Sequence, residues 1–213
     1  MATKLQKEFS KNVFINCPFD KDYSSLLRPL VFTIVYLGFN PKIALERADA
    51  GEQRVDKILS LIKQSKYSIH DLSRTRSGKK AEFCRLNMPF ELGVDYGCRR
   101  ISVNHLKSKK FLLLEKQAHD YQRALSDLSG VDIQNHGNIP FKAVRAVRNW
   151  FVDTVRLPRV DSASAIWYRF NEFTYDFYRK RKAEGFSRDD LNMMPLPEYI
   201  EFIKTWINSY LPR

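Results

Sequence analysis

The sequence lacks the features that mark several large classes of protein. It has only three cysteines in 213 residues, and they form neither a CxxC pair nor an even set for disulfides. Its longest apolar stretch, residues 30–37, is far shorter than the roughly 20 residues of a membrane-spanning helix. The basic N-terminus has no apolar segment of the kind found in secretory signals. We therefore expect a cytoplasmic protein with reduced thiols and no membrane partner.

Motifs for common cofactors and catalytic groups are missing as well. Glycines are few, and none form the GxGxxG or GxxxxGK[ST] phosphate-binding loops. There is no GxSxG nucleophile turn and no HExxH zinc motif. The four histidines are scattered, without the spacing of metal ligands. These absences argue against kinases, NTPases, triad hydrolases and metalloenzymes, so we expect neither a metal nor a resident cofactor.

Positive charge is abundant and unevenly spread. The net charge is +12, and residues 1–150 hold 26 basic and 15 acidic side chains, or +11 of that total. The stretch 74–116 alone carries 11 basic and 4 acidic residues. Such a field attracts polyanions or phosphorylated small molecules, although a merely solvated basic surface has the same composition.

The order of apolar patterns predicts an α/β domain. Short β-rich runs at residues 12–16, 39–45, 67–72, 110–115 and 131–134 alternate with helical patterns. The intervening helices are expected at 24–38, 51–65, 88–98, 121–130 and 139–157. Alternation of this kind favours a flavodoxin- or Rossmann-like parallel sheet with helices on both faces.

The pattern changes after Pro158. Two aromatic-rich helices, at 163–185 and 197–211, follow with no strand between them. We therefore divide the chain into an α/β domain, residues 1–157, and a C-terminal helical appendage, residues 158–213. The appendage is expected to pack on the sheet domain or on a partner subunit, which includes a second copy in a homo-oligomer.

Polar residues follow the predicted strands where an open α/β sheet binds its ligands. Cys17, Phe19 and Asp20 come after the first strand, and Asp71, Ser73 and Arg74 end or follow the third. Asn87 and Glu91 lie near the start of the next helix, where Phe90 and Leu92 flank Glu91 and Gly93 permits close backbone approach. Burial would raise the pKa of Glu91, and the helix N-terminus would oppose that shift.

Two carboxylates, Asp71 and Glu91, are thus expected to converge on one cleft. Cleavage of a glycosidic bond uses such carboxylates as nucleophile, electrostatic stabiliser or acid. A purely structural alternative remains, in which Glu91 pairs with a basic residue such as Arg28 or Arg99 and Asp71 caps a loop.

Three segments resemble known families. KNVFINCPFDKDY, residues 11–23, resembles the first box of Toll/interleukin-1 receptor (TIR) domains and the opening of nucleoside 2-deoxyribosyltransferases. Residues 70–73, HDLS, resemble the "ADL" strand end of the transferases, and residues 89–97, PFELGVDYG, resemble their catalytic "FELGYA" helix. The resemblance covers about residues 11–98.

The resemblance implies roles for individual residues. Glu91 matches the transferase nucleophile and the essential glutamate of TIR NAD+ hydrolases, and Asp71 matches the aspartate that contacts the base. Phe19 and Asp20 match loop positions that line the nucleotide pocket. Arg85 stands where the transferases have an acidic residue, and residues 85–88 replace their DxGT run. These departures favour a more phosphorylated substrate than a deoxynucleoside.

The leading hypothesis is therefore an enzyme that cleaves or transfers an N-glycosidic bond of a nucleotide. NAD+ is the expected substrate rather than a cofactor, and bacterial antiphage defence is the setting that the resemblance implies. The substrate-binding residues would be Cys17, Phe19, Asp20, Ser73, Arg74 and Asn87. Two alternatives are a non-catalytic TIR-like module that senses a nucleotide or nucleic acid, and a nucleoside deoxyribosyltransferase. No helix-turn-helix or zinc-finger pattern supports nucleic-acid binding.

Overall fold

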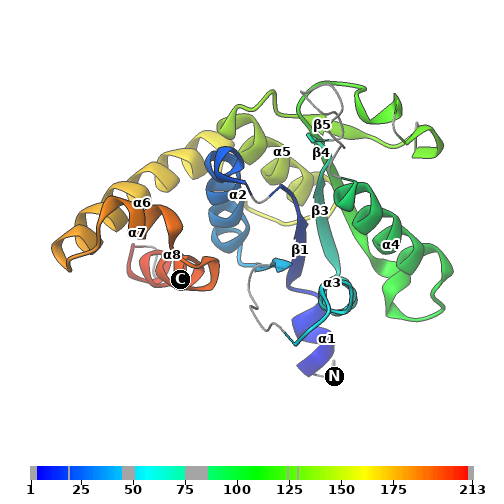
Figure 1. Cartoon of the computed structure of the whole chain (residues 1–213), viewed down its shortest axis with the longest axis horizontal. Coiled ribbons are helices and arrows are strands. Elements are labelled where there is room, and N and C mark those ends of the chain that lie inside the picture. Colours follow the sequence, from blue (N-terminus) through cyan, green and yellow to red (C-terminus); the bar gives the residue numbers. More distant parts are fainter. Residues whose placement is uncertain are drawn as a thin grey trace.

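The chain folds around one parallel sheet (Figure 1). The structure is a computed structural model that describes residues 4–18, 20–44, 51–74, 86–123, 125–128 and 130–210. Its neighbouring strands are all parallel, in the order β2-β1-β3-β4-β5. This order is that of flavodoxin-like sheets, so the predicted α/β fold class is confirmed. The strands are β1 (Asn12–Asn16), β2 (Asn40–Lys42), β3 (Tyr67–Asp71), β4 (Lys110–Glu115) and β5 (Ile133–Asn135).

Helices cover both faces of the sheet, as the strand–helix alternation predicts. In Figure 1, α2 and α5 lie on one side of the strands, and α3 and α4 lie on the other. The C-terminal helices α6 and α8 pack outside α2. The helices are α1 (Lys4–Phe9), α2 (Ser24–Tyr36), α3 (Arg54–Lys63), α4 (Asn87–Ile101), α5 (Pro140–Asp153), α6 (Ala163–Ala183), α7 (Arg188–Met193) and α8 (Leu196–Tyr210).

The two central strands are buried along their whole length. Every residue of β1 (NVFIN) and of β3 (YSIHD) is buried, because helices cover these strands from both sides. The edge strand β2 is only three residues long and contains Pro41. The predicted strand at 39–45 is therefore too long, since proline cannot donate to the ladder and is tolerated at a sheet edge.

The helices differ from the sequence prediction in several places. The helix expected at 121–130 is replaced by 3-10 turns at Tyr121–Arg123 and Ser126–Leu128. The Glu115 carboxylate accepts the backbone N–H groups of His119 and Tyr121, which holds this segment in a tight wrap over β4. Pro29 lies inside α2, in its second turn. Helices α1 and α7, of six residues each, are too short for the periodicity to predict.

One apolar core joins the sheet to the C-terminal helices. Phe32 of α2 is fully buried, and its ring contacts Phe170 and Phe173 of α6 and Trp206 of α8. Buried residues from β1, β3, β4, α2, α5, α6 and α8 belong to the same cluster. Aromatic residues at helical spacing in 163–210 are thus largely core. In the part of the chain that the structure describes, no helix is both long and apolar enough to span a bilayer.

Candidate functional site

The carboxyl ends of β1 and β3 lie side by side at the upper edge of the sheet in Figure 1. The chain order reverses between these two strands, which is where open α/β sheets bind ligands. A cavity of about 560 Å³ opens beside them, between the start of α2 and the ends of β3 and β4. Its lining is mostly polar: Asp22, Tyr23, Ser25, Leu26, Ser73, Arg74, Lys116, Gln117, Asp120 and Asn138.

Asp71 lies directly behind this cavity and is fully committed to hydrogen bonds. Its Oδ2 accepts from the Tyr23 hydroxyl at 2.5 Å and from His136 Nε2 at 3.0 Å, and its Oδ1 accepts the backbone N–H of Ser73 at 2.8 Å. Burial alone would raise the pKa of Asp71, but His136, Ser73 and Tyr23 outweigh it and hold the pKa below its ordinary value. Asp71 is therefore an ionised carboxylate with two of the cavity's lining residues as donors.

His136 is the partner that the sequence did not reveal. It is fully buried, and its Nδ1 accepts the backbone N–H of Asn138 at 3.0 Å. Because Nδ1 accepts, the ring hydrogen sits on Nε2, which faces Asp71 Oδ2 and Ser73 Oγ, both at 3.0 Å. Serine and aspartate share one ring nitrogen here, so this is a positioning cluster and not a nucleophilic triad, which needs both nitrogens.

Glu91 is the second buried carboxylate at this edge. It lies in α4, is 2% exposed, and its Oε1 has no hydrogen-bond partner in the described structure. Its ion-pair partner is Arg54 of α3, a loose contact at 3.7 Å from a side chain that is half exposed. Burial raises the pKa of Glu91 to about 7, and Arg54 acts in the opposite direction. Glu91 thus pairs with a basic residue, as the structural alternative predicts, but that residue is Arg54, because Arg28 turns to the C-terminal helices.

A buried network holds α4, and with it Glu91, against the sheet. Asp95, one turn after Glu91 on the same helix face, accepts from Ser68 Oγ at 2.5 Å and lies 3.2 Å from His70 Nε2. Lys109 Nζ is 3.1 Å from Asp95 Oδ1, and all these side chains are fully buried. His70 and neighbouring donors keep the pKa of Asp95 below its ordinary value in spite of burial.

Asn16 extends this network to the first turn of α4. Its Nδ2 donates to the Met88 carbonyl at 2.8 Å and lies 3.1 Å from His70 Nδ1. Its Oδ1 is buried without a partner. The end of β1 is therefore tied to the helix that carries Glu91.

Cys17 directly follows β1, near the carboxyl groups of Asp71, Glu91 and Asp20. Its thiol is buried, and burial followed by the charges of Asp71, Glu91 and Asp20 raises its pKa well above the ordinary value. Three carboxyl groups act on one sulfur atom, so they share one neighbourhood at the edge of the sheet. A thiol in this setting stays protonated, which makes it a poor nucleophile.

The remaining predicted residues behave differently. Arg74, predicted to bind substrate, pairs through Nη2 with Asp20 Oδ1 at 3.0 Å. This ion pair neutralises part of the positive charge that a phosphorylated substrate would meet. Asn87 is exposed at the first position of α4, and no described contact joins it to the cavity. Phe19 lies outside the described residues, as does most of the basic loop 73–86, residues 75–85.

The immediate surroundings of Glu91 differ from the prediction. Leu92 is buried, but Phe90 is 55% exposed and points away from the core, because helical geometry places neighbours about 100° apart. A Cβ at Gly93 would meet no atom within 4 Å, so this glycine serves no close backbone approach. Helix α4, which carries Glu91, packs against β1, β3 and α3.

Neither Asp71 nor Glu91 lines the cavity, so the expected convergence of the two carboxylates on one cleft is not seen. Asp71 reaches the cavity through its hydrogen bonds with Tyr23 and Ser73, whereas Glu91 comes from α4 and meets Arg54 of α3. Functional groups that the sequence analysis missed are Tyr23, Arg54 and His136. A histidine next to the predicted strand 131–134 was the available signal for the last of them. Among the described residues, no cluster of three or more histidine, cysteine, aspartate or glutamate side chains is arranged to hold a metal ion.

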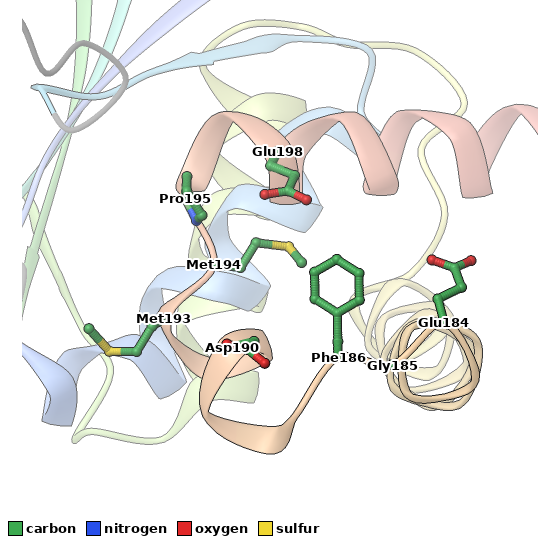
Figure 2. Close-up of a pocket in the computed structure, with 8 residues that line it drawn as sticks. All are labelled: Glu184, Gly185, Phe186, Asp190, Met193, Met194, Pro195 and Glu198. Carbon is green, nitrogen blue, oxygen red and sulfur yellow. The ribbon is translucent and has the colours of Figure 1, made fainter.

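Cavities also occur on the C-terminal helices. One has a volume of about 460 Å³; Figure 2 shows Phe186 and Met194 next to each other in it, with Glu198 above them, Asp190 below and Glu184 to the right. It contains none of the predicted site residues.

Comparison of the chain with protein-family models, curated proteins and solved structures gives no match.

Proposed function

We propose that this protein cleaves the N-glycosidic bond of a nucleotide, with NAD+ as the substrate and nicotinamide as the released base. The observation that carries the proposal is Glu91, a buried carboxylate whose Oε1 accepts no hydrogen bond among the described residues and meets only the loose contact of Arg54, at the carboxyl edge of a parallel sheet. A second, ionised carboxylate, Asp71, stands behind the adjacent cavity.

The chemistry suits these groups. Nicotinamide leaves NAD+ as a neutral molecule from a cationic pyridinium, so departure needs no strong general acid. Positive charge then develops at C1′ of the ribose. An ionised Glu91 would stabilise that charge or trap the carbon covalently, and water would complete hydrolysis. Low local dielectric strengthens this attraction.

Asp71 would act on the substrate indirectly, through the residues that it holds in place. Its oxygens are largely occupied by Tyr23, Ser73 and His136, so its role is to fix the donors that line the cavity. Tyr23, Ser73 and Asn138 would meet ribose hydroxyls, and Lys116 and Arg74 would meet phosphate. The likeness of residues 89–97 to the transferase helix supports the same assignment for Glu91. A role in bacterial antiphage defence belongs to this proposal through the TIR resemblance.

The test is nicotinamide release from NAD+ by the purified full chain at high protein concentration. Glu91→Gln is expected to lower the rate by roughly 100-fold or more without lowering the melting temperature. Glu201→Gln, the same change at an exposed site on α8, is the matched control. Normal turnover by Glu91→Gln would overturn the assignment. Exchange of base between a deoxynucleoside and a free base, without hydrolysis of NAD+, would replace it with the transferase alternative.

A further inference from the structure

A second cavity with a strong charge bias lies on the C-terminal helices, away from the carboxyl edge of the sheet. It encloses about 560 Å³ between the second half of α6 and α7. This volume falls in the usual range of small-molecule sites, roughly 300–1,000 Å³. We call it the α6–α7 groove; it is lined by Thr174, Tyr175, Tyr178, Arg179, Lys182, Phe186, Ser187, Arg188, Leu191 and Asn192.

The charged residues that line the α6–α7 groove are all cations: Arg179, Lys182 and Arg188. Neither Lys182 nor Arg188 has an ion-pair partner within the described part of the chain. Arg179 meets Asp176 only loosely, at 3.5 Å. The groove therefore presents two unneutralised cations and a third that is partly neutralised.

Phe186 lines this groove and also the neighbouring cavity in Figure 2, and the two cavities have charged residues of opposite sign. Every charged residue that lines the neighbouring cavity is acidic, namely Glu184, Asp190 and Glu198. The corner at Gly185, with φ of 94°, turns the chain so that acids fall on one side and bases on the other. The cations of the groove therefore have no acidic residue among the groove's own lining, which favours binding of an anion there.

Aromatic rings stand beside the cations. Tyr175 is 68% exposed, whereas Phe173 and Phe177 of the same helix are buried. The Arg179 guanidinium lies 5.7 Å from the centre of this ring. An exposed ring next to cations offers a stacking face for a planar group on the same ligand.

The floor of the groove is fixed by Arg28 of α2. Its guanidinium donates to the Tyr178 hydroxyl at 3.1 Å and to the Leu191 carbonyl at 2.5 Å. It also stacks 4.8 Å from the centre of the Tyr199 ring. Tyr178 in turn donates to Asn192 Oδ1 at 3.0 Å. A lining held in this way loses little conformational freedom when a ligand binds.

We infer that the α6–α7 groove is a second ligand site for a small nucleotide, with its phosphates between Lys182 and Arg188 and its base against Tyr175. This site is independent of the chemistry at Glu91. It combines the two features that a nucleotide requires, a cluster of unpaired cations and an accessible ring.

The experiment uses calorimetric titration of the full chain with ADP, with inorganic pyrophosphate and with a short oligo-dT strand. Lys182→Gln combined with Arg188→Gln should weaken ADP binding by about tenfold or more. Tyr175→Ala should weaken ADP binding but leave pyrophosphate binding nearly unchanged. Lys204→Gln combined with Arg145→Gln is the charge-matched control, and Glu91→Gln separates the groove from the sheet site; both should bind ADP as the wild type does.

Three results would overturn the inference. The first is ADP binding that the Lys182 and Arg188 changes leave intact, or the absence of ADP binding. The second is oligo-dT binding that is much tighter than ADP binding and is lost in the same variant, which would make the groove a nucleic-acid surface. The third is a drop in oligomer mass in that variant without ADP binding, which would assign the groove to the acidic cavity of a second copy.

Discussion

His136 Nε2 lies 3.0 Å from Asp71 Oδ2, which joins the residue after β5 to the last residue of β3. Both side chains are buried, and Tyr23 reaches the same oxygen from the residue before α2. Three segments that are distant in the sequence therefore meet on one carboxylate behind the cavity.

Replacing His136 with alanine should destabilise the protein by roughly 1–3 kcal/mol, because it leaves a buried carboxylate short of a donor. The pKa of Asp71 should rise as that donor is lost. Urea unfolding of His136→Ala and of the exposed control His105→Ala would measure the difference. Equal stability of the two variants would contradict the importance of this pair.

Glu91 should make the wild-type protein less stable as pH rises. Its pKa is raised from an ordinary 4.5 to about 7 by burial, so the folded state binds the proton more tightly than the unfolded state. The resulting stabilisation, up to about 3 kcal/mol, is complete below pH 4.5 and is lost as pH rises through about 7. Comparing unfolding free energies between pH 5 and pH 8 in wild type and Glu91→Gln tests this, since the glutamine variant should lack that decline.

Arg54→Gln should move the same transition to higher pH. Arg54 is the cation that opposes the raised pKa of Glu91, and its removal leaves burial unopposed. The pH dependence of stability should therefore shift upward, and the activity proposed above should require more alkaline solution. Arg100→Gln, an exposed change at the end of α4, serves as the comparison. Superimposable profiles for Arg54→Gln and wild type would show that the 3.7 Å contact has no influence.

Lys109→Met should be severely destabilising, by about 3–5 kcal/mol, because it strands the buried Asp95 charge. Combining it with Asp95→Asn removes that charge and should recover part of the loss. A double-mutant cycle by chemical unfolding measures the coupling. Strict additivity of the two changes would refute a direct interaction between these side chains.

The general fold could be predicted from the sequence because it follows from local patterns. Strand β4 was predicted with the bounds that the structure has, since KFLLLE is a compact apolar run with charged ends. Helix α5 was predicted too long by a few residues at its C-terminal end, because Val155 and Leu157 continue the apolar pattern after the helix has ended at Asp153. The edge strand β2 was overestimated because its apolar neighbours serve other contacts.

The candidate site was predicted only in part, because its partners come from separate segments. Asp71 and Glu91 stood out by their positions after strands. The partners Tyr23, Arg54 and His136 approach from the starts of α2 and α3 and from the end of β5, and no local pattern announces such meetings. The burial of Glu91 was expected, but Phe90 and Gly93 were the wrong reasons for it, since the enclosing atoms come from neighbouring elements.

The Phe32 ring joins α2 to the C-terminal helices α6 and α8. This contact limits how the protein can be shortened. A fragment that stops near residue 157 would expose a large hydrophobic surface of α2 to water. Such a fragment should aggregate on expression. Fusion tags and insertions are better tolerated at exposed turns such as the corner at Gly185 than at the junction between the two halves.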